Sequence, residues 1–121
     1  MNKVFLVEDS PLVLARLKDL LAGAAEVVGE AGSAHAAIAG ILAAQPDLVL
    51  LDLNLAEGSG FDVLRAVQPR LPQADFYMLS NFASFPYRQL AGRLGAKDYF
   101  DKTKDFERLR DVVAQRGVVT H

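Results

Sequence analysis

Five polar residues stand out in the sequence because each of them closes or follows a short apolar run. Two adjacent acids follow the first run, one acid closes the third, a serine closes the fourth and a lysine follows the fifth: Glu8, Asp9, Asp52, Ser80 and Lys102. If the five runs are parallel strands, their carboxyl ends meet at one edge of a sheet, where open α/β sheets bind ligands. The sequence therefore predicts one polar site assembled from distant parts of the chain.

The charges of these residues indicate which chemistry is open to them. Three carboxylates held together repel one another unless some are protonated or a cation joins them. A cluster of oxygen ligands suits Mg²⁺, which uses few protein carboxylates and completes its shell with water and phosphate oxygens. A carboxylate can also attack phosphorus to give an aspartyl phosphate, while a lysine ammonium and a serine hydroxyl contact the transferred group. The set therefore favours Mg²⁺-assisted phosphoryl transfer.

The runs that end at these residues predict strands, and the stretches between them predict helices. Continuous apolar and β-branched runs are typical of strands buried on both faces of a parallel sheet. We place the strands at 4–7, 26–30, 48–51, 76–79 and 99–100. A helix should begin after Ser10 as its N-cap, with Pro11 in its first turn. Apolar residues three and four positions apart predict further helices over 34–44, 61–67, 87–94 and 106–113.

This alternation of strands and helices predicts right-handed crossovers and a doubly wound α/β fold. Helices should cover both faces of a five-stranded parallel sheet. The 121 residues fit one domain over 1–121. We expect the apolar faces of the helices, which include Tyr87 and Phe106, to form the core and the tail over 117–121 to fray.

Composition excludes several other classes of protein. The chain has no cysteine, which excludes thiol chemistry and a cysteine-based zinc site and argues against a disulfide scaffold. The formal net charge of −2 provides no basic surface of the kind that nucleic-acid binders use. No apolar run approaches the roughly 20 residues that span a bilayer, and Glu8 and Asp9 interrupt any signal-peptide pattern. We therefore expect a cytoplasmic domain that binds neither nucleic acid nor membrane directly.

Four segments of the chain resemble the receiver domains of response regulators, in that family's order and spacing. They are VFLVEDSP, LVLLDLNLAEGSGFDVL, FYMLSN and GAKDYFDK. The resemblance covers essentially the whole chain and implies a flavodoxin-like sheet with strand order 2-1-3-4-5. It implies a signalling switch of a two-component or phosphorelay system, which assists its own phosphorylation and dephosphorylation but is not a classical enzyme.

The same resemblance implies a metal site and a phosphoacceptor. Asp52 would accept the phosphoryl group and contribute to the Mg²⁺ site. Asp9 would bind Mg²⁺ directly, Glu8 would help to hold it through water, and Asn54 would supply its backbone carbonyl.

The remaining roles implied by the resemblance concern the phosphoryl group and the switch. Ser80 and Lys102 would contact the phosphoryl group, and Ser80 and Tyr99 would form the switch pair. Gly60 matches the family's glycine eight residues beyond the acceptor.

The sequence departs from the family at three positions. Ala56 stands four residues after the acceptor and Thr103 stands after the lysine, where the family usually has proline, and Asn81 replaces a small residue. A cis bond before Thr103 would cost about 2.5–4 kcal/mol, against about 0.5–1 kcal/mol before proline. One hydrogen bond to a charged group returns only about 1.5–3 kcal/mol. We therefore predict a trans Lys102–Thr103 bond, with the loop over 103–105 placed so that Lys102 still reaches Asp52 and Asp105 caps the last helix.

Two other functions of an aspartate at this position would require different residues around it. A phosphohydrolase with an aspartyl-phosphate intermediate needs a second acid near the nucleophile, but Asn54 stands two residues after Asp52, and the chain leaves no room for a cap. A degenerate receiver would be expected to lack Asp52, Asp9 or Lys102, and all three are present. The pattern therefore favours the switch.

The resemblance also implies the partners. The phosphoryl donor would be a sensor histidine kinase or a phosphotransfer protein, and the output would be an unidentified protein or a phosphorylation-dependent homodimer. Because no helix-turn-helix segment follows the last predicted helix, we expect a stand-alone or phosphorelay module rather than a DNA-binding regulator.

Overall fold

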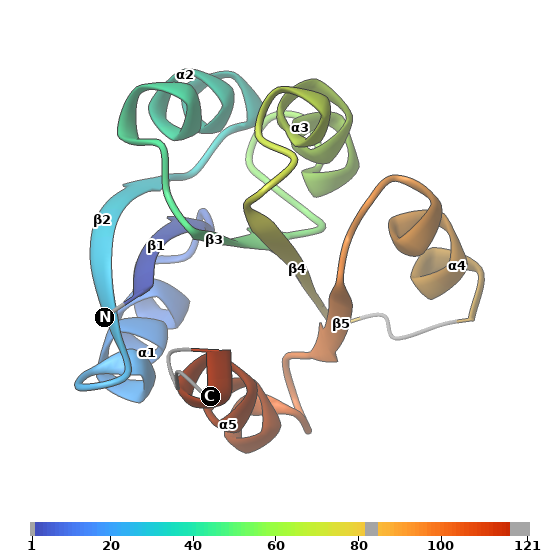
Figure 1. Cartoon of the computed structure of the whole chain (residues 1–121). Helices are drawn as coiled ribbons and strands as arrows, with labels where there is room; N and C mark the ends of the chain where they lie inside the picture. Colours follow the sequence, from blue (N-terminus) through green and yellow to red (C-terminus); the bar gives the residue numbers. More distant parts are fainter. Residues whose placement is uncertain (1, 82–84, 117–121) are drawn as a thin grey trace.

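The computed structural model describes residues 2–81 and 85–116, which form a parallel sheet between two layers of helices (Figure 1). The strands are β1 (Asn2–Val7), β2 (Ala25–Ala31), β3 (Leu48–Asp52), β4 (Asp75–Ser80) and β5 (Asp98–Asp101). Their order in the sheet is β2-β1-β3-β4-β5, and every neighbouring pair is parallel. The predicted fold class and strand order are confirmed. Each strand is longer than its apolar run because the flanking residues also pair in the sheet.

The helices are α1 (Pro11–Leu21), α2 (Ala34–Ala44), α3 (Gly60–Val67), α4 (Phe85–Arg93) and α5 (Phe106–Arg116), and a 3₁₀ turn, η1 (Gln68–Arg70), follows α3. The side chain of Ser10 accepts a hydrogen bond from the amide of Val13, which confirms the predicted start of α1. Ser33 and Ser59 cap α2 and α3 in the same way. None of the helices in the described part of the chain is long and apolar enough to cross a bilayer. The predicted fraying of 117–121 lies outside the described residues.

Two apolar layers hold the helices to the sheet. Helices α2, α3 and α4 pack on one face, and α1 and α5 pack on the other. Side chains of β1 alternate between the layers, because Phe5 and Val7 face the first while Val4 and Leu6 face the second. Both faces of the sheet are therefore covered, and its polar residues can emerge only at its edges.

Helix α4 is packed less closely than its sequence predicts. Only Ala91 of this helix is fully buried, while Tyr87 is 42% exposed and Phe85 is 73% exposed. The prediction that Tyr87 belongs to the buried face is therefore wrong. Its ring instead contacts Phe61 of α3 at 6.3 Å between centroids, because α4 stands at the margin of the layer.

Gly60 allows α3 to begin directly against the end of β3. A β-carbon at this position would lie inside van der Waals contact of the carbonyl oxygen of Asp52 and 3.0 Å from the Cε of Met78. The obstacle is mainly backbone, which cannot rotate away as a flexible side chain can. The glycine therefore sets the distance between α3 and the strand that ends on Asp52.

Replacing Gly60 with alanine should destabilise the fold. The added methyl group overpacks the junction of β3 and α3, so we expect Gly60→Ala to lower the free energy of unfolding by about 1–3 kcal/mol. Gly92 is the matched control, since nothing lies within 4 Å of a β-carbon there. Gly92→Ala should instead raise stability by up to about 1 kcal/mol through helix propensity. Urea unfolding measures both, and equal effects of the two substitutions would refute this account of Gly60.

Candidate functional site

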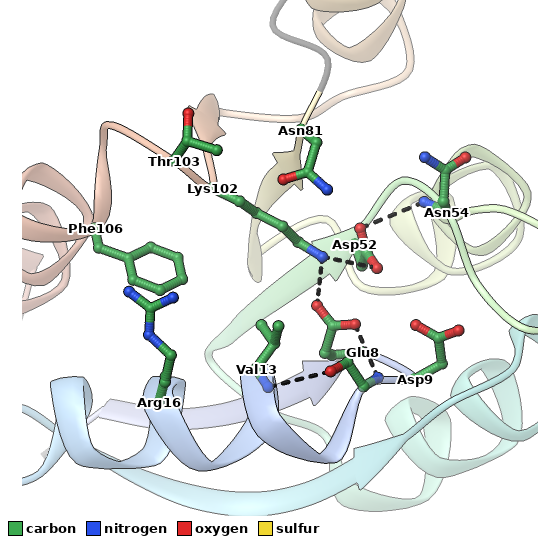
Figure 2. Close-up of a pocket in the computed structure, with 11 residues that line it drawn as sticks. Glu8, Asp9, Val13, Arg16, Asp52, Asn54, Asn81, Lys102, Thr103 and Phe106 are labelled. Carbon is green, nitrogen blue, oxygen red and sulfur yellow. Dashed lines mark hydrogen bonds and ion pairs between the residues drawn. The ribbon is translucent and has the colours of Figure 1, made fainter.

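Four of the five residues singled out in the sequence, Glu8, Asp9, Asp52 and Lys102, line one cavity at the carboxyl edge of the sheet (Figure 2). Glu8 and Asp9 follow β1, Asp52 ends β3, and Lys102 follows β5. Ser80 ends β4 and is fully buried beside them. The strand order reverses between β1 and β3, which is where open α/β sheets leave a crevice for ligands. A cavity of about 490 Å³ lies there, lined by Glu8, Asp9, Asp52, Asn54, Asn81 and Lys102 among others.

A buried ion-pair network lies at the floor of this cavity. The Nζ of Lys102 is 2.5 Å from Oε1 of Glu8 and 3.0 Å from Oδ2 of Asp52. The three side chains are 11%, 1% and 5% exposed, respectively. Water therefore screens their charges weakly, so each interaction is strong and each uncompensated charge is costly. The single ammonium of Lys102 thus forms ion pairs with two carboxylates.

Burial and hydrogen bonding separate the pKa values of the two carboxyl groups. Burial alone would raise the pKa of Glu8, but hydrogen bonds from Lys102 and from the amide of Ser10, at 3.1 Å, hold it below its ordinary value. Burial raises the pKa of Asp52 to about 7, Lys102 opposes the rise, and the charge of Glu8 adds to it. Although burial alone would lower the pKa of Lys102, both carboxylates raise it. Glu8 is therefore the anionic partner of Lys102, and Asp52 is only partly compensated.

The acidic residues fit a divalent cation. Glu8, Asp9 and Asp52 each offer a carboxylate oxygen, and these oxygens lie within 4.8 Å of one another. Asp9 is exposed at the mouth of the cavity. Asn54 lies in the same cavity, and its amide donates to Oδ1 of Asp52 at 3.4 Å. An all-oxygen set that opens to water is the donor chemistry that Mg²⁺ prefers.

The predicted switch pair, Ser80 and Tyr99, lies on the two strands at the far side of the site. Tyr99 is 4% exposed and packs in the layer of α2, α3 and α4. Burial raises the pKa of its hydroxyl group, and hydrogen bonding with Ser80 opposes the rise. The carbonyl of Tyr99 accepts from Arg88 of α4 at 3.2 Å and from Arg108 of α5 at 2.9 Å. Tyr99 is therefore connected both to Ser80 and to the two helices that flank β5.

The backbone after β5 confirms one prediction and corrects another. No cis peptide bond occurs in residues 2–81 and 85–116, so the Lys102–Thr103 bond is trans as predicted, and Lys102 still contacts Asp52. The carbonyl of Asp105 accepts from the amide of Leu109 at the start of α5. Its carboxylate, however, turns back to accept from the amide of Asp101 at 2.8 Å. Asp105 therefore stands at the start of α5, but its side chain does not cap the helix as predicted, because it has a partner in the preceding loop.

Sequence reasoning missed the residues that form the outer wall of the cavity. Val13, Arg16 and Phe106 line it, and the guanidinium of Arg16 lies 4.6 Å from the centroid of the Phe106 ring. The apolar pattern of α5 placed Phe106 in the core, but it is only partly buried, unlike Leu109. The available signal was positional, since α1 and α5 begin just after Asp9 and Lys102. The first turns of both helices therefore border the same edge of the sheet.

The sequence of this chain matches a protein-family model and several known proteins of the same family. The sequence model of the response regulator receiver domain family matches residues 4–114. The chain is 39% identical over 104 residues to the DNA-binding transcriptional activator DevR/DosR of Mycobacterium tuberculosis, covering 84% of this chain and 48% of that protein. It is 34% identical over 121 residues to the response regulator protein PilR of Pseudomonas aeruginosa, covering 93% of this chain and 25% of that protein. The chain thus spans about half the length, or less, of these relatives.

Solved structures share the fold over almost the whole chain. The receiver domain of AraT, a response regulator from Geobacillus stearothermophilus, superposes with a TM-score of 0.83 and 27% sequence identity. The match covers 94% of this chain and 91% of that one.

The raised pKa of Asp52 makes the stability of the fold depend on pH. Because the pKa is raised from 3.8 to about 7 on folding, the folded chain binds more protons than the unfolded chain between those values. The contribution of Asp52 to the free energy of unfolding is therefore lost as pH rises from about 4 to about 7. An Asp52→Asn variant lacks this loss, so it should gain stability over the parent across that window, by a few kcal/mol.

Urea unfolding of both proteins in metal-free buffer measures this gain at each pH. Asp111→Asn, which removes an exposed acid on α5, is the control for the loss of a carboxyl group outside the site. A gap between Asp52→Asn and the parent that stays constant or narrows as pH rises would contradict the raised pKa.

Proposed function

Because the chain belongs to the response regulator receiver domain family, we propose that it is a phosphoacceptor switch that takes a phosphoryl group on Asp52. One observation carries the proposal: the Asp52 carboxylate lies 3.0 Å from the Lys102 ammonium, within 4.8 Å of oxygens of Glu8 and Asp9, at the edge of an open cavity. The phosphoryl donor is a histidine kinase or a phosphotransfer protein of a two-component system.

In the proposed reaction an oxygen of Asp52 attacks the phosphorus of a phosphohistidine. The new O–P bond forms as the P–N bond breaks, and the bonding electron pair leaves with the imidazole nitrogen. The attack requires Asp52 in its anionic form, which the neighbouring Lys102 favours against the effect of burial. As the phosphoryl group arrives, Lys102 neutralises its oxygens, and Glu8 keeps the ammonium in place through the 2.5 Å contact.

The acidic cluster holds a divalent cation in this proposal. Asp9 and Asp52 would bind Mg²⁺ directly, Glu8 would contribute through water, and Asn54 would add its backbone carbonyl. When bound, Mg²⁺ supplies positive charge that offsets the charge of the carboxylates and of the phosphoryl oxygens. The support from the chain is its donor set, which contains only oxygens and keeps one carboxylate, that of Asp9, exposed.

Phosphorylation is read out through Ser80 and Tyr99. The hydroxyl of Ser80 donates to a phosphoryl oxygen, which alters its hydrogen bonding with Tyr99. Arg88 and Arg108 bind the carbonyl of Tyr99, so a shift of β5 at this residue reaches α4 and α5. The weakly packed α4 is then the element most easily moved, and the face formed by α4, β5 and α5 binds the output protein or a second copy of the chain.

Phosphorylation can be tested with a small donor. Acetyl phosphate and Mg²⁺ should add the mass of one phosphoryl group to the intact chain, and Asp52→Asn should add none. Lys102→Ala should slow the reaction by about tenfold or more, because a preorganised cation at the reacting group is lost. Asp111→Asn is the control and should react like the parent. Phosphorylation of Asp52→Asn at the parental rate would reject Asp52 as the acceptor.

Cation binding should depend on Asp9. An Asp9→Asn variant should bind Mg²⁺ about tenfold more weakly or worse, since it loses a charged ligand of a hard cation. Amide chemical shifts of Glu8, Asp9 and Asp52 report the titration. Glu26→Gln, an exposed acid on β2, is the control and should leave the affinity unchanged. Parental affinity in Asp9→Asn would remove Asp9 from the site.

A further inference from the structure

The segment from Asp101 to Asp105, which joins β5 to α5, forms a closed set of hydrogen bonds around Lys102. The Oδ1 of Asp101 accepts from the amide of Thr103 at 2.7 Å and from its hydroxyl at 2.6 Å. The amide of Asp105 donates to the carbonyl of Asp101 at 2.9 Å, and the amide of Asp101 donates to Oδ2 of Asp105 at 2.8 Å. The backbone amide of Lys104 donates to the same carbonyl at 3.3 Å. The two aspartates therefore bind each other reciprocally across the loop.

This set of bonds fixes the backbone on the C-terminal side of Lys102. On the N-terminal side, the amide of Lys102 donates to the carbonyl of Ser80 at 2.9 Å, which continues the pairing of β5 with β4. Past Lys102 the strand pairing ends, and the next residue is Thr103, whose backbone dihedral angles are not restricted by a ring as those of proline are. The Asp101–Thr103 hydrogen bonds supply that restriction.

The charge of Asp101 is suited to this role. Hydrogen bonds from the side chain and backbone of Thr103 lower the pKa of Asp101, so its carboxylate stays anionic and a strong acceptor. Asp105 adds a link to the next element, because its carbonyl begins the hydrogen bonding of α5 and its carboxylate also lies 3.7 Å from Arg108. Hydrogen bonds of Asp105 thereby connect the loop to both β5 and α5.

The geometric demand on Lys102 is high. Its ammonium must reach two carboxylates at the ends of two other strands, at 2.5 and 3.0 Å, from a loop position next to two exposed residues, Thr103 and Lys104. A long side chain loses much conformational freedom when its end is held in place. The backbone conformation at Lys102 therefore decides whether its ammonium can reach both carboxylates. A small rotation of the loop would separate Lys102 from Asp52.

We propose that Asp101, Thr103 and Asp105 are positioning residues that aim Lys102 at Asp52. The consequence for the reaction rests on the proposed function of Asp52 as phosphoacceptor, whereas the placement of Lys102 does not. The competing explanation is that these bonds only begin α5, in which case their loss would lower stability and leave Lys102 unaffected.

The test compares Thr103→Val with Thr103→Ser. Valine keeps the shape and the backbone amide but removes the hydroxyl that donates to Asp101, whereas serine keeps the hydroxyl. The first measurement is the ¹⁵N spectrum of the lysine ammonium groups at low temperature and at a pH above the pKa of Asp52, with the Lys102 signal assigned by its absence in Lys102→Met. An ammonium held between two carboxylates exchanges its protons slowly and is visible, and an exposed one exchanges quickly. The second is the rate of phosphorylation by acetyl phosphate with Mg²⁺.

We expect Thr103→Val to broaden or abolish the Lys102 signal and to slow phosphorylation about threefold or more, the effect of losing one hydrogen bond to a charged group at an exposed site. Thr103→Ser should restore both, and the urea midpoints of the two variants should agree. A Thr103→Val protein with the parental signal and rate would overturn the proposal. If the parent itself is not phosphorylated yet its Lys102 signal depends on Thr103, the positioning role stands and the phosphoacceptor function fails.

Discussion

The ammonium of Lys102, held between the carboxylates of Glu8 and Asp52, is the interaction on which the rest of the site depends. The three charges come from the ends of β1, β3 and β5, so they meet only when those strands lie parallel and in register. Removing Lys102 from this buried set would leave both carboxylates without a counter-charge. The strand order brings the end of β3 within reach of Lys102, and Gly60 lets α3 begin directly against that end.

The network contains two carboxyl groups but only one ammonium group, so Asp52 lacks a full counter-charge. Glu8 has a lowered pKa because it takes hydrogen bonds from Lys102 and Ser10, while Asp52 has a pKa of about 7 because burial outweighs its share of Lys102. A folded protein selected only for stability would not keep a carboxyl group in that state. A divalent cation or a phosphoryl group would change the charge balance around Asp52, and the exposed Asp9 leaves room for the cation. The same imbalance that weakens the fold at neutral pH therefore prepares the site for ligand.

Much of this arrangement follows from the sequence, because strand ends and helix starts carry local signals. The runs that end on Asp52 and Ser80, and the cap at Ser10, were sufficient to predict the sheet and the convergence of the acids. Side-chain choices between competing partners were not predictable in this way. Tyr87 has the right spacing for a buried face, yet α4 lies at the margin and leaves it exposed. Asp105 has the position of a helix cap, but its carboxylate binds the amide of Asp101, a choice decided by how the loop closes around Lys102.

The central claim is that Asp52 carries an acyl phosphate, and chemical trapping tests it most directly. Borohydride reduces an aspartyl phosphate to the alcohol, which leaves homoserine at the modified position. Treating the chain with acetyl phosphate and Mg²⁺, then with borohydride, and mapping its peptides by mass spectrometry should find homoserine at Asp52, and none when acetyl phosphate is omitted. Homoserine at Asp9 or elsewhere, with Asp52 unmodified, would contradict the account.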